Sequence, residues 1–148
     1  MIKAFKVQFP TAYVERNPDK QYQKSPPDML ACTPTANYLI EAKTRLCKGR
    51  NKPWYVKHLR EHQVEHLELW QNIADHYHAY VALLYYNQLR GKQRMRRAWL
   101  IPFDYVTGFE NKHGRKSIHL HHLENDIPHL EMTWENRIWK LPEEICNH

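Results

Sequence analysis

The chain has 148 residues, a length that fits one domain with its own hydrophobic core. Apolar residues make up 42% of it, yet no apolar run approaches the roughly 18 residues that a membrane-spanning helix needs. The formal net charge of +6 is compatible with a nucleic-acid partner, and three scattered cysteines without a CxxC pair exclude a zinc ribbon or an iron–sulfur motif.

The first 27 residues combine one strand-like stretch with a loop. The opening MIKAFKVQFP lacks the long apolar stretch and cleavage site of a signal peptide, so we expect a soluble, intracellular (cytoplasmic) protein that does not bind membranes. Apolar and polar residues alternate in AFKVQF, which predicts a strand. NPDKQYQKSPP is typical of turns and loops.

Two apolar runs then surround a turn. MLAC at 29–32 and NYLIEAK at 37–43 flank TPTA, which predicts a β-hairpin. The segment after it, CKGRNKP, is polar and basic and predicts a loop.

A helix is expected next, over residues 58–77. Its apolar residues fall on one face at about 100° per residue. They are Leu59, His66, Leu67, Trp70, Ile73, Ala74 and Tyr77.

Two further strands complete the pattern. AYVALLYY at 79–86 is a continuous apolar run, typical of a strand covered on both faces, and AWLIPFDYV at 98–106 predicts another. The order strand, strand, helix, strand, strand predicts an α/β domain with a mixed β-sheet and flanking helices. We expect a single domain over 1–148, with a core at about 25–106 and a C-terminal extension at 107–148. In that extension KSIHLHHL suggests a strand and WENRIWKLPEEI a short helix.

The chemistry is expected at the hairpin. Asp28 follows two prolines, and Glu41 lies 13 positions later, close to the end of the second strand. A hairpin of this length can bring both carboxylates to one end, where a divalent cation removes their mutual repulsion. Glu41 and Lys43 share a strand face, and the Ala42 carbonyl is a further possible ligand. These groups suffice for metal-assisted phosphodiester hydrolysis.

The helix strengthens this hypothesis. Glu and Lys two residues apart are common on exposed strands, so Glu41 and Lys43 alone are a weak signal. Gln63, however, lies in the middle of the apolar helix face, where its amide needs a partner. If the helix packs on the hairpin, Gln63 points at the carboxylates. A purely structural glutamine remains the alternative.

Pro27-Asp28, then Glu41-Ala42-Lys43, then HQVEHL at 62–67, resemble the PD-(D/E)xK nuclease superfamily, and most closely the RecU-type Holliday junction resolvases. The resemblance covers about residues 25–90. The VRR-type nuclease domain is a close relative with the same order of residues. The resemblance implies a restriction-endonuclease-like core and a Mg²⁺-dependent endonuclease, with Mn²⁺ as a substitute, acting on branched DNA as a homodimer. It implies Asp28 and Glu41 as metal ligands, Lys43 as the catalytic lysine and Gln63 as a supporting residue.

The N-terminal part departs from that family. Its members begin with a helix that carries another acidic residue, whereas strand and loop are expected here. Glu15 is the candidate to replace that acid. The DNA-inserting stalk of the family has no counterpart beyond ERNPDKQYQK at 15–24.

Basic residues and aromatics are expected to bind the phosphates and bases. They gather between residues 43 and 60 and between residues 90 and 97. The candidates are Arg45, Lys48, Arg50, Lys52, Trp54, Tyr55, Arg90, Lys92, Arg94, Arg96 and Arg97.

Three alternatives stay open. A nuclease of the same superfamily could cut flaps or duplex DNA instead of junctions. A nucleic-acid-binding module could carry the motif without activity. The eleven histidines, above all His119 and His121 in IHLHHL, suggest a zinc site, although no third ligand follows at a typical spacing and structural zinc sites need four.

Overall fold

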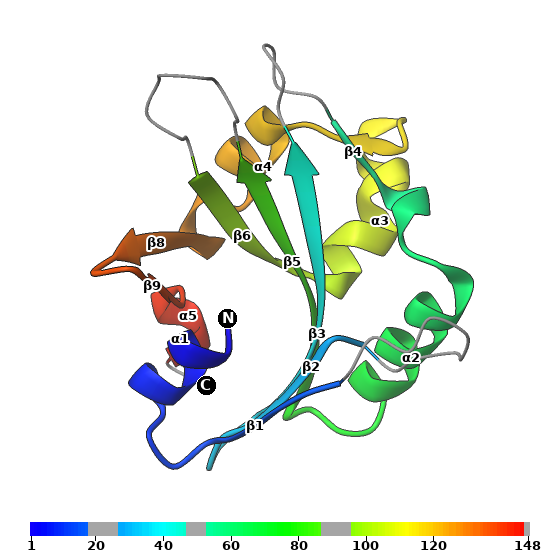
Figure 1. The fold of residues 1–148 in the computed structure, drawn as a ribbon. Coiled ribbons are helices and arrows are strands. Elements are labelled where there is room, and N and C mark those ends of the chain that lie inside the picture. The colour runs from blue at the N-terminus through cyan, green and yellow to red at the C-terminus, as the bar shows by residue number, and fades with distance from the viewer. Residues whose placement is uncertain (18–26, 47–52, 87–95, 147–148) are drawn as a thin grey trace.

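The computed structural model describes residues 1–17, 27–46, 53–86 and 96–146. A seven-stranded β-sheet runs through these residues, and helices lie on both of its faces (Figure 1). Across the sheet, the strands are β1 (Tyr13–Arg16), β2 (Met29–Cys32), β3 (Asn37–Leu46), β5 (Tyr77–Tyr86), β6 (Arg96–Pro102), β8 (Glu131–Glu135) and β9 (Ile138–Lys140). The β3–β5 pair is parallel and the other pairs are antiparallel. The predicted α/β class, a mixed sheet with flanking helices, is therefore confirmed.

The helices divide between two apolar cores. On one face, α2 (Glu61–Gln71), α3 (Phe103–His113) and α4 (Leu120–Asp126) contribute to the larger core. On the other face, α1 (Ile2–Gln8) and α5 (Glu143–Cys146) cover part of the sheet. The connections include the 3₁₀ helices η1 (Val56–His58) and η2 (Pro128–Leu130) and a separate small sheet of β4 (Trp54–Tyr55) and β7 (Ser117–Ile118).

Strand β3 carries different chemistry on its two faces because successive side chains alternate. Leu39 belongs to the core under α2, and Tyr38 and Ile40 belong to the core under α1. By the same alternation Glu41 and Lys43 face α2. The chain reaches β5 through α2, in the order that the sequence predicts, and β5 lies parallel to β3.

The expectation for the N-terminus is wrong. Residues 2–8 form helix α1, not a strand. Ala4 and Phe5 are buried, and Phe5 and Phe9, four residues apart, stack with a ring-centroid distance of 6.3 Å. The apolar residues therefore serve one helical face, and the alternation seen in AFKVQF is incidental.

Three C-terminal expectations also fail. The strand expected over 98–106 ends at Pro102, and α3 begins at Phe103. KSIHLHHL forms only the two-residue strand β7 before α4 begins at Leu120. Most of WENRIWKLPEEI forms the β8–β9 hairpin, and a short helix follows at Glu143. The region expected as an extension thus adds two strands to the main sheet.

Strands β3 and β5 finish at the same end of the sheet. Leu46 and Tyr86, which close β3 and β5, are partners in the parallel register. The segments that follow them in the chain contain most of the predicted phosphate-binding residues. Among the described helices, none is long and apolar enough to cross a membrane.

Candidate metal-dependent nuclease site

Asp28 and Glu41 lie at the end of the β2–β3 hairpin. Met29 pairs with Ile40 as the last register pair, so Asp28 stands beside the strand at the level of Glu41. The Ala42 N–H donates to the Asp28 carboxylate, with an N···Oδ2 distance of 2.8 Å. Since β2 has ended there, this carboxylate takes the place that a strand partner would occupy.

The Glu41 carboxylate is buried, with only 2% of the residue exposed. Its Oε1 accepts hydrogen bonds from Lys43 Nζ at 2.6 Å and from Gln63 Nε2 at 2.5 Å. Its Oε2 is also buried and has no hydrogen-bond partner among the described groups. A buried carboxylate oxygen without a partner is costly, so this atom is suited to bind a cation.

Burial raises the pKa of Glu41 above its ordinary value. The Lys43 ammonium opposes this effect through its hydrogen bond and its charge, whereas the negative charge of Asp28 raises the pKa further. Two carboxylates that influence each other in this way favour a shared cation, because the cation would relieve both burial and repulsion.

Gln63 connects helix α2 to the hairpin. Its Oε1 accepts from Lys43 Nζ and from the Arg60 backbone N–H, both at 3.0 Å, while its Nε2 donates to Glu41. The amide therefore closes the first turn of α2 and holds the lysine and the glutamate together. Gln63 does point at the hairpin.

The donor set fits a hard divalent cation. Asp28 and Glu41 supply carboxylate oxygens, and the Ala42 carbonyl faces the same edge as the Ala42 N–H that Asp28 binds. Within the described parts of the chain, no group of three or more His, Cys, Asp or Glu could hold a metal. Two carboxylates with water and phosphate in the other positions are typical of Mg²⁺ and not of zinc.

Cations gather beside the carboxylates. Arg45 follows Lys43 on the same face of β3, and its Nε is buried without a partner among the described groups. The pKa of His58 is lowered by partial burial and by the positive charges of Arg45, Lys57 and Lys43. From the sequence, His58 was expected at the start of the helix 58–77, off its apolar face, and was not singled out, whereas the structure places it in η1.

The predicted nucleic-acid contacts separate into distinct groups. Trp54 is 1% exposed and packs in the larger core, so its indole cannot stack on a base in this structure. Tyr55 is exposed, with Lys57 Nζ 5.4 Å from its ring centroid. Arg97 is engaged by Glu131 at 2.7 Å and by Glu124, whereas Arg96 is exposed. Outside the described residues lie Lys48, Arg50, Lys52, Arg90, Lys92 and Arg94.

Two secondary candidates do not join the site. Glu15 lies on the exposed edge strand β1, where the Tyr13 hydroxyl donates to it at 2.9 Å. His119 and His121 do not share a strand face, because His119 precedes helix α4 and His121 lies within it. The histidines of this region contact one another, yet in the described residues they form no metal-binding group.

Comparisons with known proteins yield a structural similarity. No family model and no curated protein matches the chain. Among solved structures, the chain is similar to Hjc, a Holliday junction resolvase from the archaeal hyperthermophile Archaeoglobus fulgidus. The two share 21% identity with a TM-score of 0.45, over 80% of this chain and 79% of that chain.

Proposed function

We propose that this protein is a Mg²⁺-dependent DNA endonuclease of the PD-(D/E)xK superfamily that cuts branched DNA, as a RecU-type Holliday junction resolvase does. The β2–β3 hairpin, the α2 crossover and parallel β5 support a restriction-endonuclease-like core. The observation that carries the proposal is the Glu41 carboxylate, which is buried beside Asp28. One of its oxygens accepts from Lys43 and Gln63, and the other has no partner among the residues that the structure describes.

Each residue then has a defined task. Asp28, the free oxygen of Glu41 and the Ala42 carbonyl would hold Mg²⁺ or Mn²⁺, which when bound would activate water and neutralise phosphate charge. Lys43, held by Glu41 and Gln63, places its ammonium where it can stabilise an attacking hydroxide or the charge that develops on the phosphate. Gln63 keeps that ammonium in position.

The oligomeric state follows from the reaction proposed. Symmetrical cutting of a four-way junction needs two sites related by a two-fold axis, so we propose a C2 homodimer. Flap or duplex cleavage by the same site would need only one copy.

A cleavage panel tests the function. Duplex, flap, fork and four-way-junction DNA would be incubated with the wild-type protein in Mg²⁺, in Mn²⁺ and in EDTA. We expect metal-dependent cleavage that is fastest on the junction. Lys43→Ala should lower the cleavage rate by about 100-fold or more while junction binding in EDTA is retained, because charge stabilisation is lost. The control variant Lys116→Ala, at an exposed lysine that pairs with Glu110 at 3.5 Å, should cleave normally.

The panel also separates the alternatives. Faster cleavage of a flap or duplex than of the junction would support the nuclease function and contradict the proposed junction substrate. A wild-type protein that binds every DNA and cuts none with either metal would reject the enzyme. Asp28→Asn supplies a second test, because the amide oxygen can still accept from Ala42 while the negative charge is gone.

A further inference from the structure

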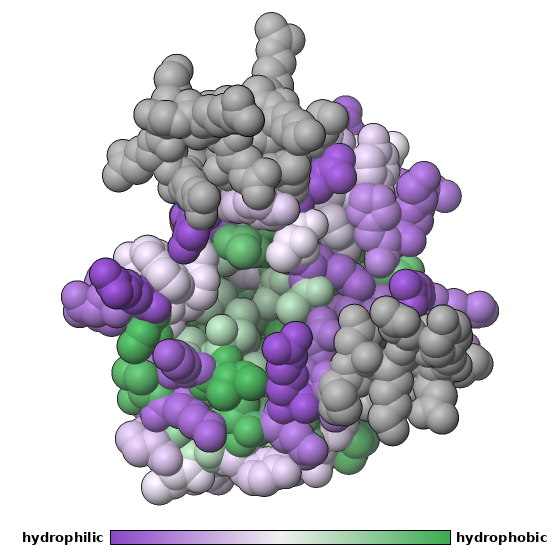
Figure 2. Space-filling model, viewed as in Figure 1, coloured by the Kyte–Doolittle hydropathy of each residue, from purple (hydrophilic) through white to green (hydrophobic). Residues whose placement is uncertain are grey.

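The face of the sheet opposite α2 carries an open groove, which we call the hairpin groove. It has a volume of about 890 Å³ and lies between α1, β3 and the β8–β9 hairpin. Figure 2 shows this face hollowed at its centre, with hydrophobic residues inside the hollow and hydrophilic residues around it. The residues that define the groove are Arg16, Asp28, Ala42, Thr44, Trp134 and Arg137.

The groove adjoins the candidate metal site at the point where β2 ends beside β3. Asp28 and Ala42 line it, although Glu41, Lys43 and Gln63 lie on the α2 side. Ala42 and Thr44 are exposed at this point of β3, because α1 does not extend over them. A strand of nucleic acid in the groove would therefore lie next to Asp28.

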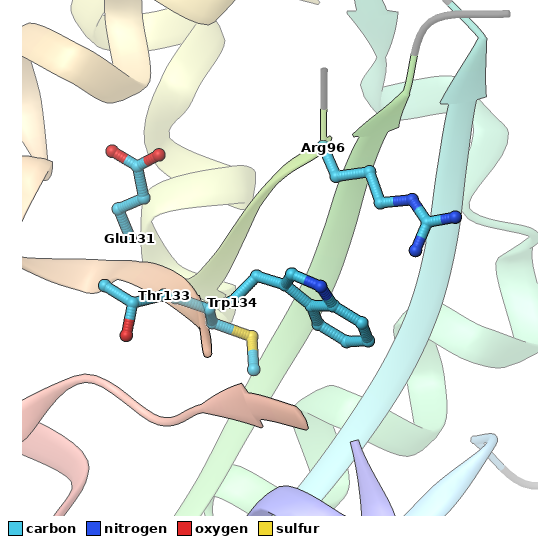
Figure 3. Close-up of a pocket in the computed structure, with 5 residues that line it drawn as sticks. Arg96, Glu131, Thr133 and Trp134 are labelled. Carbon is cyan, nitrogen blue, oxygen red and sulfur yellow. The ribbon is translucent and has the colours of Figure 1, made fainter. Parts of the chain in front are cut away.

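Trp134 stands at the wall of the groove as a rigid, exposed aromatic. It is 42% exposed, and its ring packs edge-on against Trp139, its cross-strand partner, with a centroid distance of 5.0 Å. The Arg96 guanidinium lies 5.7 Å from the Trp134 ring centroid. In Figure 3, Arg96 and Trp134 both extend toward the central strands, whereas Glu131 points away from them.

The charged residues that line the groove favour the binding of an anionic ligand. Lys3, Arg16 and Arg137 line it, and Asp28 is the one acidic residue among its described lining residues. Asp28 is also the residue that would be neutralised by a bound metal. Cations beside an exposed indole are the combination that binds single-stranded nucleic acid, with phosphates on the cations and a base on the ring.

We infer that the hairpin groove binds unpaired nucleotides of the DNA substrate, with a base stacked on Trp134 and the backbone held by Arg16, Arg96 and Arg137. Intact duplex keeps its bases stacked inside the helix and presents none to Trp134. The groove would thus select DNA that has unpaired bases near the cut, such as a fork, a flap or an opened junction. That these nucleotides belong to the substrate rests on the proposed nuclease function.

Oligonucleotide binding in EDTA tests the inference. Fluorescence anisotropy would measure the affinity for labelled (dT)12, for an abasic strand of the same length and for a 12-bp duplex. We expect the wild type to prefer (dT)12 over the abasic strand by about 5-fold to 100-fold, as one base stacked on an aromatic contributes. Trp134→Ala should lose this preference while duplex affinity stays within twofold.

Two further variants serve as controls for Trp134→Ala. Tyr13→Ala removes another exposed aromatic, on β1 outside the groove, and should leave both affinities unchanged. If Trp134→Ala unfolds, which a thermal melt reveals, Trp134→Phe replaces it and should retain only part of the base preference. Equal wild-type affinity for (dT)12 and the abasic strand, or an unchanged preference in the variant, would overturn the inference.

The failures of the two proposals are distinguishable. A wild type that prefers (dT)12 through Trp134 but cuts no DNA would reject the nuclease and leave a strand-binding groove. A wild type that cuts branched DNA without any base preference at Trp134 would reject the groove alone.

Discussion

Glu41 is the residue through which a metal ion would most affect the proposed site, even though only two carboxylates form it. One of its oxygens accepts from Lys43 and Gln63, and the other is buried with no hydrogen-bond partner in the described parts of the chain. Without a cation, the buried charge of Glu41 destabilises the folded protein, because Lys43 contacts only one of the two carboxylate oxygens. The carboxylate is thus a source of instability that a bound metal would relieve.

Metal binding should therefore stabilise the wild type but not Glu41→Gln. A ligand at ten times its Kd adds about 1.4 kcal/mol to the free energy of unfolding, or roughly 3–5 °C in Tm for a chain of this length. Thermal melts with MgCl₂, with MnCl₂ and with EDTA would measure this shift. We expect the shift to vanish in Glu41→Gln, because a neutral amide is a poor ligand for a hard cation.

The buried Glu41 carboxylate also predicts how the stability of the metal-free wild type depends on pH. Burial raises the pKa of Glu41 in the folded state, so the folded protein binds the proton more tightly than the unfolded chain does. The metal-free wild type should lose stability as pH rises from the ordinary value of 4.5 through the raised pKa of Glu41. Glu41→Gln should lack this component, whereas Glu65→Gln, at an exposed acid on α2, should retain both the pH component and the metal shift. Identical behaviour of the two variants would exclude Glu41 as the ligand.

At the scale of whole elements, the hairpin and β5 could be predicted because their signals are local. Helix α2 was also predicted, but it spans Glu61–Gln71 and not the expected 58–77, since Tyr77 already begins β5. MLAC and NYLIEAK are apolar runs around a turn, and AYVALLYY is too short and too apolar for anything but a buried strand or helix segment. Gln63 could be placed because a polar residue on an apolar helix face needs a partner, and that partner proved to be Glu41 with Lys43.

The β8–β9 hairpin could not be found in this way. The turn residues Asn136 and Arg137 both have positive φ, 50° and 64°, which defines a tight two-residue hairpin turn. Asn commonly occupies the first of these positions, but the second normally requires glycine. Because arginine occupies the position where glycine would indicate a turn, the sequence carries no hairpin signal there. The helical preference of the flanking residues therefore led to the prediction of a helix. The groove and Trp134 were missed for the same reason.

Arg137→Gly should consequently stabilise the hairpin while weakening strand binding. Glycine adopts the left-handed conformation without the roughly 1 kcal/mol cost that a side chain incurs, so Tm should rise by about 2–4 °C. The same change removes a cation from the groove, and affinity for (dT)12 should fall. Thermal melts and anisotropy would measure the two effects separately. Arg137→Lys serves as the control, since it keeps the charge and the positive φ, and both properties should stay near those of the wild type.

Over the whole molecule, charge is divided between two surfaces. The hairpin groove is basic, whereas a second pocket against β9 and α5 is acidic. Glu135, Glu143 and Glu144 line that pocket, where His129 pairs with Glu144 at 3.0 Å. An acidic surface repels phosphate, so a DNA strand is directed to the other side of the β8–β9 hairpin.

The salt dependence of strand binding should be determined by the cations of the hairpin groove and not by the net charge of the protein. Each phosphate neutralised on a single strand contributes about −0.7 to the slope of log K against log salt concentration. Arg96→Gln removes one cation beside Trp134, so the magnitude of the slope for (dT)12 should fall by about 0.7. Glu143→Gln changes the net charge by one unit in the acidic pocket and should leave the slope unchanged. Anisotropy titrations from 50 to 300 mM KCl would measure both slopes. Shifts of similar size and opposite sign in the two variants would mean that strands bind through the overall field of the protein, without a defined groove.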